Sequence, residues 1–220
     1  MTLGGLTASQ IIIVLVGASL IPYMAVLITS YTKIVIVMGI LRTALGLQAT
    51  PPNMVINGLA IILSLFIMQP VFSETWDLLK GQNLNWSTVE INKIENLWEN
   101  INPPIIQFLR QNSKLEMRRF FMKTARQSWP KEQYNKIRED NFLILVPAFV
   151  LTEMTIAFQI GFIIYLPFLV IDLVVSNILL ALGMMMISPT AISLPFKLLL
   201  FILVDGWTRL LGGLVMTYRL

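Results

Sequence analysis

Three charged side chains stand in an apolar stretch of the sequence, where they could do chemistry. From Phe142 to Val204 the only charged residues are Glu153, Asp172 and Lys197. A charge at the centre of a bilayer costs about 2.5–3.5 kcal/mol on insertion scales, so these side chains should face protein or water. Two carboxylates and an amine in such a setting could line a pore or relay protons.

A structural role is the competing interpretation of the same charges. Ion pairs and hydrogen bonds between helices or subunits would hold those helices in register, and no row of acids repeats along one face as a relay needs. Asp205 and Arg209 are four residues apart and can pair along one helix turn. Asn177 could bond across helices. The expected inter-helix polar contacts are therefore those of Glu153, Asp172, Asn177, Lys197, Asp205 and Arg209.

A run of three methionines is the second unusual feature. Met184, Met185 and Met186 follow Gly183 and precede a Ser-Pro pair at Pro189. Methionine is flexible and packs against irregular or changing surfaces, whereas an ordinary membrane core would use leucine or isoleucine. The glycine and the Ser-Pro pair predict a bend or a non-helical loop here. If several copies surrounded an axis, the methionines could form a soft ring that closes and still yields to a passing chain.

The composition excludes several kinds of chemistry. The chain has no cysteine and no histidine, which removes disulfides, thiol chemistry and metal sites ligated by those residues. The sequence has no phosphate-binding loop, no G-x-S-x-G motif and no carboxylate cluster with metal-ligand spacing. We therefore expect no enzyme, no catalytic residue, no cofactor and no metal.

The composition also indicates a membrane protein. Of the 220 residues, 56% are hydrophobic and only 13% are charged, against about 25% charged in a soluble domain. Twenty of the 28 charged residues lie between Ser73 and Asp140, 11 of them basic and 9 acidic. This near balance argues against nucleic-acid binding. The predicted class is an all-α, membrane-associated protein of broken and kinked helical hairpins.

We divide the chain into three segments on this pattern. Residues 1–72 are predicted to form N-terminal apolar helices, and residues 73–140 a small, polar, helical insert. Residues 141–220 are predicted to form C-terminal apolar helices with the methionine loop between them. Short-loop basic residues mark the cytoplasmic side of membrane proteins. Lys33 and Arg42 therefore place their region in the cytoplasm and the insert in the periplasm.

The first segment contains three expected helices. Ile11–Thr29 has no charge and about the 20 residues that a bilayer span needs, with a kink expected at Pro22. Ser30–Thr50 predicts a second helix, in which Gly39 and Gly46 share a face and would let a neighbouring helix approach closely. The third, a further spanning candidate, covers residues 55–72.

The remaining segments contain further expected helices. In the insert, apolar residues at helical spacing predict an amphipathic helix over Ile91–Ile101, and a second helix over Ile105–Ala125. The apolar stretch after Asp140 is long enough for two or three spans. Its expected breaks are the prolines Pro167, Pro189 and Pro195.

Three long blocks of the chain resemble a known family. They are PAFVLTEMTIAFQIGF (Pro147–Phe162), YLPFLVIDLVVSNILLALGMMMISPTAISLPFKLLLFILVDGWTRL (Tyr165–Leu210) and YTKIVIVMGILRTALGLQATPPNMVINGLAIILSLFIMQP (Tyr31–Pro70). Together they are similar to the SctR family of type III secretion systems, called FliP in flagella. The blocks cover most of the chain outside the insert.

The resemblance implies a function and a set of partners. Family members form a helically arranged pentamer with SctS- or FliQ-like and SctT- or FliR-like subunits, and work with SctU/FlhB-like and SctV/FlhA-like export components. The assembly passes unfolded protein substrates across the bacterial inner membrane and lies partly at periplasmic level in the secretion basal body. The family's methionine-rich loop is a gasket that seals the closed pore, and it maps by position onto the three adjacent methionines.

The sequence does not decide between the branches of the family, and it leaves two other classes of function open. Ser188-Pro189 and SWPKEQY (Ser128–Tyr134) resemble injectisome members, whereas flagellar members more often have a Pro-Pro pair. A flagellar export subunit is the alternative. A proton-coupled transporter would need a midplane ion site and internal repeats, which are not evident. A scaffold that nucleates assembly without lining a path is the other class.

Overall fold

The computed structural model describes residues 8–81, 98–134 and 137–219, and within these ranges the chain is helical with no strand. The all-helical prediction is therefore confirmed. The helices are α1 (Ala8–Ile28), α2 (Tyr31–Ala44), α3 (Asn53–Gly81), α5 (Pro103–Asn112), α6 (Leu115–Ser128), α7 (Lys131–Tyr134), α8 (Phe142–Ala181), α9 (Pro189–Leu203) and α10 (Gly206–Met216).

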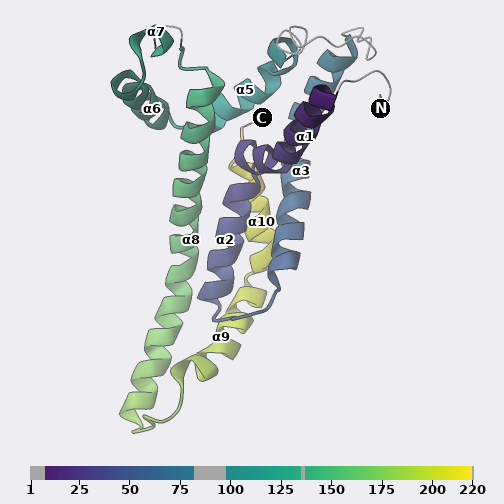
Figure 1. Cartoon of the computed structure of the whole chain (residues 1–220). Helices are drawn as coiled ribbons and strands as arrows, with labels where there is room; N and C mark the ends of the chain where they lie inside the picture. The colour runs from purple at the N-terminus through teal and green to yellow at the C-terminus, as the bar shows by residue number, and fades with distance from the viewer. Residues whose placement is uncertain (1–7, 82–97, 135–136, 220) are drawn as a thin grey trace.

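The helices form an elongated arrangement built along α8 (Figure 1). α2 and α10 run beside it in the middle of the molecule, α3 lies on the far side of them, and α5, α6 and α7 gather at one end. The loop between α8 and α9 lies at the opposite end. With 40 residues, α8 is about 60 Å long, roughly twice the thickness of a bilayer's hydrocarbon core.

Several helices are apolar and long enough to cross a membrane. By length and composition α3 and α8 each qualify alone. Two further pairs qualify together as broken spans: Pro22–Ile28 with Tyr31–Ala44, bent by 77°, and Pro189–Leu203 with Gly206–Met216, bent by 61°. This agrees with the prediction of broken and kinked apolar helices.

The prolines do not break the C-terminal helices where we expected. Pro167 lies inside α8 and Pro195 lies inside α9, and both helices continue through them. Only Pro189 marks a boundary, because it occupies the start of α9, where a missing N–H costs nothing. Apolar helices tolerate internal proline when neighbouring groups satisfy the freed carbonyl.

The insert differs from its prediction in two places. The expected boundary between residues 72 and 73 falls inside α3, which continues to Gly81. The helix expected over Ile105–Ala125 is two helices, because Ser113 is extended with φ −103° and ψ 135° and separates α5 from α6. The backbone N–H of Lys114 then donates to Thr152 Oγ1 of α8 at 3.1 Å. The helix predicted over Ile91–Ile101 lies mostly outside the described residues.

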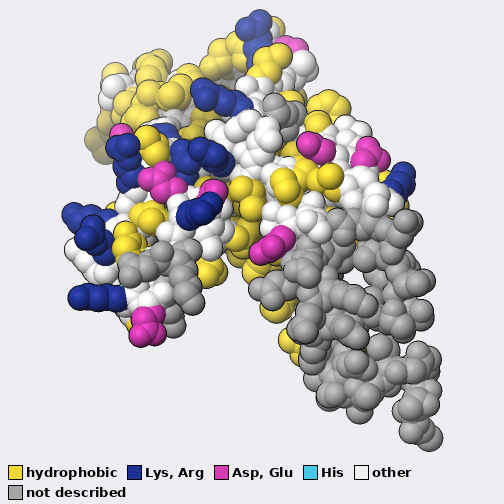
Figure 2. All heavy atoms as spheres, turned by 90° about the horizontal axis from the view of Figure 1, so that it is seen from above, with side chains coloured by type: hydrophobic (Ala, Val, Ile, Leu, Met, Phe, Trp, Pro, Cys, Tyr) yellow, Lys and Arg dark blue, Asp and Glu magenta, His cyan; other side chains and the backbone are white. Residues whose placement is uncertain are grey.

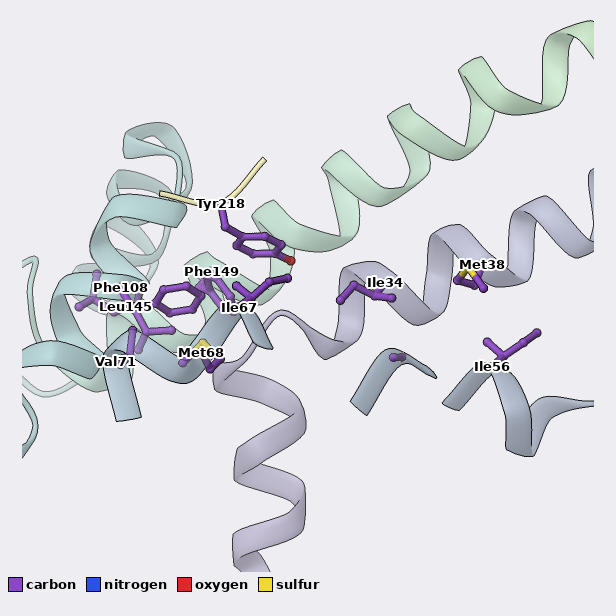
Figure 3. Packing of buried hydrophobic residues seen from close by; sticks show 12 residues of the cluster. Ile34, Met38, Ile56, Ile67, Met68, Val71, Phe108, Leu145, Phe149 and Tyr218 are labelled. Carbon is purple, nitrogen blue, oxygen red and sulfur yellow. The ribbon is translucent and has the colours of Figure 1, made fainter. Parts of the chain in front are cut away.

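One apolar core joins the insert end to the body of the molecule. It contains Ile34 of α2, Ile67 of α3, Phe108 of α5 and Phe149 of α8, all almost completely buried. Figure 3 shows the ring of Tyr218 beside this group, and it stacks on Phe108 at 6.1 Å between centroids. The burial of each such side chain stabilises the fold by about 1.5–3 kcal/mol. The C-terminal tail is therefore held in the core.

The glycine at which two helices of the chain approach closely is not one of the two that we expected. A Cβ at Gly39 would meet nothing within 4 Å, and Gly46 lies beyond the end of α2 with φ +78°. Gly161 of α8 is the close-approach position, because a Cβ there would collide with the side chain of Ile40 in α2. Within one chain, therefore, neither Gly39 nor Gly46 is a close-approach position, and α8 meets α2 through its own glycine.

Candidate functional site: buried ion pairs and the methionine loop

A buried ion pair connects α2 to α8. Lys33 Nζ lies 3.0 Å from Glu153 Oε1, and the side chains are 2% and 1% exposed. The Tyr218 hydroxyl donates to the other carboxylate oxygen of Glu153. Lys33 also donates to Thr217 Oγ1 at 3.0 Å and lies 3.7 Å from the centroid of the Tyr218 ring. The C-terminal tail thus covers the pair and satisfies both charges.

Burial and local charge keep Tyr218 a hydrogen-bond donor. Burial raises the pKa of its hydroxyl above the ordinary range, and the neighbouring Glu153 carboxylate raises that pKa further. The hydroxyl therefore stays protonated and can donate at any physiological pH. This side chain is fixed by the core around Phe108, which explains how a residue near the end of the chain reaches α8.

Lys33 was not among the expected polar contacts. We place its region in the cytoplasm because of Lys33 and Arg42, but Lys33 lies inside α2 and is buried in an ion pair, so this lysine does not itself indicate the orientation. The signal that could have found it is the scarcity of charge in the apolar segments. A lysine and a glutamate that both lie in such segments must be paired, since an unpaired buried charge is very costly.

A second ion pair connects α8 to α9. Lys197 Nζ lies 2.7 Å from Asp172 Oδ2 and donates to the backbone carbonyl of Ala44 at 3.1 Å. Ser193 donates to the other carboxylate oxygen of Asp172 at 2.6 Å. Ala44 is the last residue of α2, whose terminal carbonyls lack helical partners and attract a cation. The lysine therefore ties three helices together.

The other predicted contact residues have different surroundings. Asp205 does not pair with Arg209: its carboxylate accepts a hydrogen bond from Thr208 Oγ1 at 3.1 Å. Asp205 also adopts φ +51° directly ahead of α10, and its carboxylate bonds within the first turn of that helix and not one turn further on, where Arg209 lies. Asn177 lies exposed on α8, and within the described ranges its side chain has no hydrogen bond.

These pairs do not form a continuous proton path in one chain. Glu153 and Asp172 are 19 residues apart on α8, which separates them by about 28 Å along the helix axis. Each carboxylate is already occupied by a lysine and a hydroxyl. Across the described part of the chain, no group of three or more acidic side chains could hold a metal ion. The geometry of the two ion pairs therefore fits a role in joining helices better than a role in ion or proton transfer.

The three methionines lie in a short loop between α8 and α9. The loop expected from the glycine and the Ser-Pro pair is present: Gly183 has φ +68°, and α9 begins at Pro189. Met185 is 80% exposed and Met186 is fully exposed. The loop therefore presents apolar, flexible side chains at the end of the molecule opposite the insert (Figure 1).

Comparison with known proteins identifies the family. Residues 14–214 match the sequence profile of the FliP family. The chain is 50% identical over 209 residues to Yop proteins translocation protein R of Yersinia pestis, covering 95% of each. It is 44% identical over 211 residues to Hypersensitivity response secretion protein HrcR of Ralstonia nicotianae, covering 96% of this chain and 97% of that protein. It is 44% identical over 213 residues to Virulence protein YscR of Salmonella typhimurium, covering 95% and 96%.

The chain belongs to the FliP family. Its relatives place it in the SctR, or injectisome, branch, as its sequence blocks had indicated. It is thus a type III secretion export protein and not an enzyme.

Proposed function

We propose that this chain is a core subunit of the export gate of a type III secretion system. Several copies, arranged as a helical pentamer, surround an axis through which unfolded protein substrates cross the bacterial inner membrane. SctS-like and SctT-like subunits complete the channel, and SctU-like and SctV-like components deliver substrates to it. The insert faces the periplasm, and the assembly lies partly at periplasmic level.

The observation that carries this proposal is the exposure of the methionine loop. Three adjacent apolar side chains, Met184, Met185 and Met186, stand outside the core of a single chain. Exposed apolar groups in such a cluster need a cover. Equivalent loops from sister subunits would cover one another around the axis, and flexible thioethers would let that contact open and reclose. The loop is the gasket of the closed gate.

The apolar faces of the body support assembly with other chains. α8 exposes Phe158, Phe162, Ile163 and Leu173 on sides that do not pack on α2. An apolar cleft of about 600 Å³ between α8, α9 and α10 is lined by residues such as Ile160, Leu200, Gly213 and Leu214. Because Gly213 carries no side chain, a neighbouring helix could approach α10 closely. Such surfaces fit helices of sister and partner subunits as well as lipid.

The polar contacts have a supporting role in this proposal. Glu153, Asp172 and Lys197 hold α2, α8 and α9 in one arrangement, so that the loop between α8 and α9 has a defined position. Asn177 and Arg209 are exposed and are free to contact neighbouring subunits. Asp205 shapes the turn between α9 and α10.

Replacement of Met184, Met185 and Met186 by alanine tests the gasket. The substitution removes most of the side-chain volume at the proposed seal, so cells that produce the assembled complex should become leaky to ions and small dyes. The matched control is alanine at Met54 and Met216, which are similarly exposed but lie outside the loop. A tight membrane around an intact triple-alanine complex would contradict the proposal.

Crosslinking a stalled substrate separates a channel from a scaffold. A photoreactive residue at Met185 should crosslink to a substrate arrested during export if the loop faces the path. The same residue placed at Met54 serves as the control. A scaffold that lines no path would give no substrate crosslink at either position while still supporting assembly.

A further inference from the structure

Two charges stand without an ion-pair partner at the corner where α9 meets α10. Asp205 lies between the two helices, and Arg209 lies one turn into α10. α9 and α10 together are apolar enough to form one broken membrane span, bent by 61°. Neither charge takes part in the ion pairs of the described residues. The roles discussed so far give Asp205 only the turn and leave Arg209 without a partner.

The position of this corner separates it from most other charged residues. Twenty of the 28 charged residues belong to residues 73–140, and Figure 2 shows basic and acidic side chains gathered on the face at the insert end. The corner of α9 and α10 instead lies in the body of the molecule, between that end and the methionine loop (Figure 1). Ile202, Leu203 and Trp207 around it are exposed apolar side chains. The two charges therefore stand in an apolar surface.

Assembly would remove water from both charges. The proposed function covers the apolar faces of this chain with neighbouring chains, and the charges at the corner lie among those faces. A buried charge without a partner is strongly destabilising, whereas a buried pair with good geometry is tolerated. Asp205 and Arg209 do not pair within the chain, although they are four residues apart. Each of them therefore needs an opposite charge from another chain.

The backbone at Asp205 keeps a carboxylate where glycine would be easier to accommodate. Asp205 has φ +51° and ψ +48°, in the left-handed region, which residues other than glycine, asparagine and aspartate rarely adopt. Its side chain is exposed, and its carboxylate accepts one hydrogen bond, from Thr208 Oγ1 at 3.1 Å. A carboxylate has about four acceptor positions. The carboxylate of Asp205 can therefore also accept hydrogen bonds from a guanidinium group.

Arg209 lies at the edge of the apolar cleft between α8, α9 and α10. The cleft measures about 600 Å³, and the buried side chains of Phe168, Phe201 and Leu214 lie at its base. Arg209 is exposed and is the one charged residue among the described residues that line it. Gly213 lines the cleft as well and leaves room for a side chain from outside. The cleft thus suits an apolar segment that carries one carboxylate.

Asp205 does not line this cleft, so the two charges belong to different patches of the surface. The first patch is the cleft with Arg209. The second, which we call the corner patch, consists of Ile202, Leu203 and Asp205. Every copy of the chain carries both patches. A contact between two different patches repeats head to tail around an axis, as the proposed arrangement of copies requires.

We infer that the corner patch of one copy docks in the cleft of the next copy, where its Asp205 pairs with Arg209. This inference rests on the proposed assembly of identical copies. Arginine and a carboxylate can share two parallel hydrogen bonds, which fix the geometry of the contact. Ile202 and Leu203 cover the apolar lining at the same time. A carboxylate from a different chain would satisfy Arg209 but would leave Asp205 unpaired, so a second copy is the occupant that satisfies both.

Crosslinking between two kinds of copy tests this contact. The chain has no cysteine, so a thiol can be placed at one position in each copy. Copies with Asp205→Cys and copies with Arg209→Cys carry different tags and are produced together with the neighbouring small membrane proteins. Where the two kinds alternate, every second contact keeps the native pair, so the complex should assemble. A short bis-methanethiosulfonate reagent should then link the two kinds into a mixed dimer that carries both tags.

Thr208 supplies the matched control, because it precedes Arg209 in α10, is exposed and does not line the cleft. Copies with Asp205→Cys and copies with Thr208→Cys should give at most a trace of mixed dimer. Equal yields of mixed dimer from Thr208→Cys and Arg209→Cys would overturn the inference, as would an intact complex with no mixed dimer. In the latter case native mass spectrometry still shows several identical copies, so the proposed function stands. A wild-type chain that gives no multiple of its own mass would contradict the proposed function instead.

Removal of the charges shows whether the contact is an ion pair. Asp205→Asn keeps the shape of the side chain and a residue type that tolerates positive φ, and Arg209→Gln removes the other charge. Each substitution should lower the yield of assembled complex about tenfold or more, as the loss of one partner of a buried pair does. The double variant leaves no unpaired charge and should recover part of this loss. Single-variant losses that simply add in the double variant would overturn the inference.

Discussion

Lys33 and Glu153 form a salt bridge of 3.0 Å inside a single chain, with both side chains almost completely buried. The pair joins α2 to α8, and Thr217 and Tyr218 of the C-terminal tail complete its hydrogen bonds. Charges in apolar helices of an oligomeric protein could instead have been paired between subunits. Here the chain satisfies them itself, because both partners and their hydrogen-bonding groups belong to one chain.

Removal of one partner of this pair should be strongly destabilising. Glu153→Gln leaves the Lys33 charge buried and uncompensated, which costs about 3–5 kcal/mol. The double variant Lys33→Met and Glu153→Gln removes both charges and should recover most of that loss. Thermal unfolding of Glu153→Gln, Lys33→Met and the double variant in detergent measures the coupling. Simple addition of the single-variant losses would contradict a direct pair.

Asp172→Asn should weaken the contact between α8 and α9. The substitution keeps the shape but leaves Lys197 with only the Ala44 carbonyl and an amide as partners. We expect a lower yield of assembled complex, measured by copurification from membranes, whereas Gln159→Ala, at an exposed polar position of the same helix, should leave the yield unchanged. Normal assembly with lost, pH-dependent export would point instead to a proton relay through Asp172.

The same substitution, glycine to alanine, should have opposite effects on stability at Gly39 and at Gly161. Gly39→Ala places a methyl group in open space and should stabilise α2 by up to about 1 kcal/mol through helix propensity. Gly161→Ala gains the same propensity but pushes the side chain of Ile40 aside, which costs about 1–3 kcal/mol when a packed core is overfilled. Unfolding midpoints of the two variants compare the effects. Equal stabilisation would show that α8 and α2 are not in close contact there.

The size of the isolated assembly decides between a gate and a transporter. Expressed with its neighbouring small membrane proteins and extracted in detergent, the chain should give a native mass of several identical copies plus two other small chains. The exposed apolar faces of α8 and α10 are the reason to expect partners. A stable monomer or dimer without partners would remove the axis on which the gasket depends.

Local features of the chain could be read without the structure. The scarcity of charge predicts apolar helices, and Gly183 with Pro189 predicts the loop of three methionines, because a positive φ and a helix start depend on neighbouring residues alone. The family blocks also lie in continuous stretches of sequence. Helix existence, the loop and the family therefore follow from short-range patterns.

The partners of the buried charges depend on how the helices pack. Lys33 meets Glu153, and Ile40 meets Gly161, only because α2 lies against α8 at one particular rotation and depth. Arg209 lines the cleft beside α8 only because the chain bends by 61° between α9 and α10. The sequence determined which residues need a partner, since an unpaired charge in an apolar segment is costly. The tertiary structure decided which partner each one has, because packing between distant helices minimises that cost for all of them together.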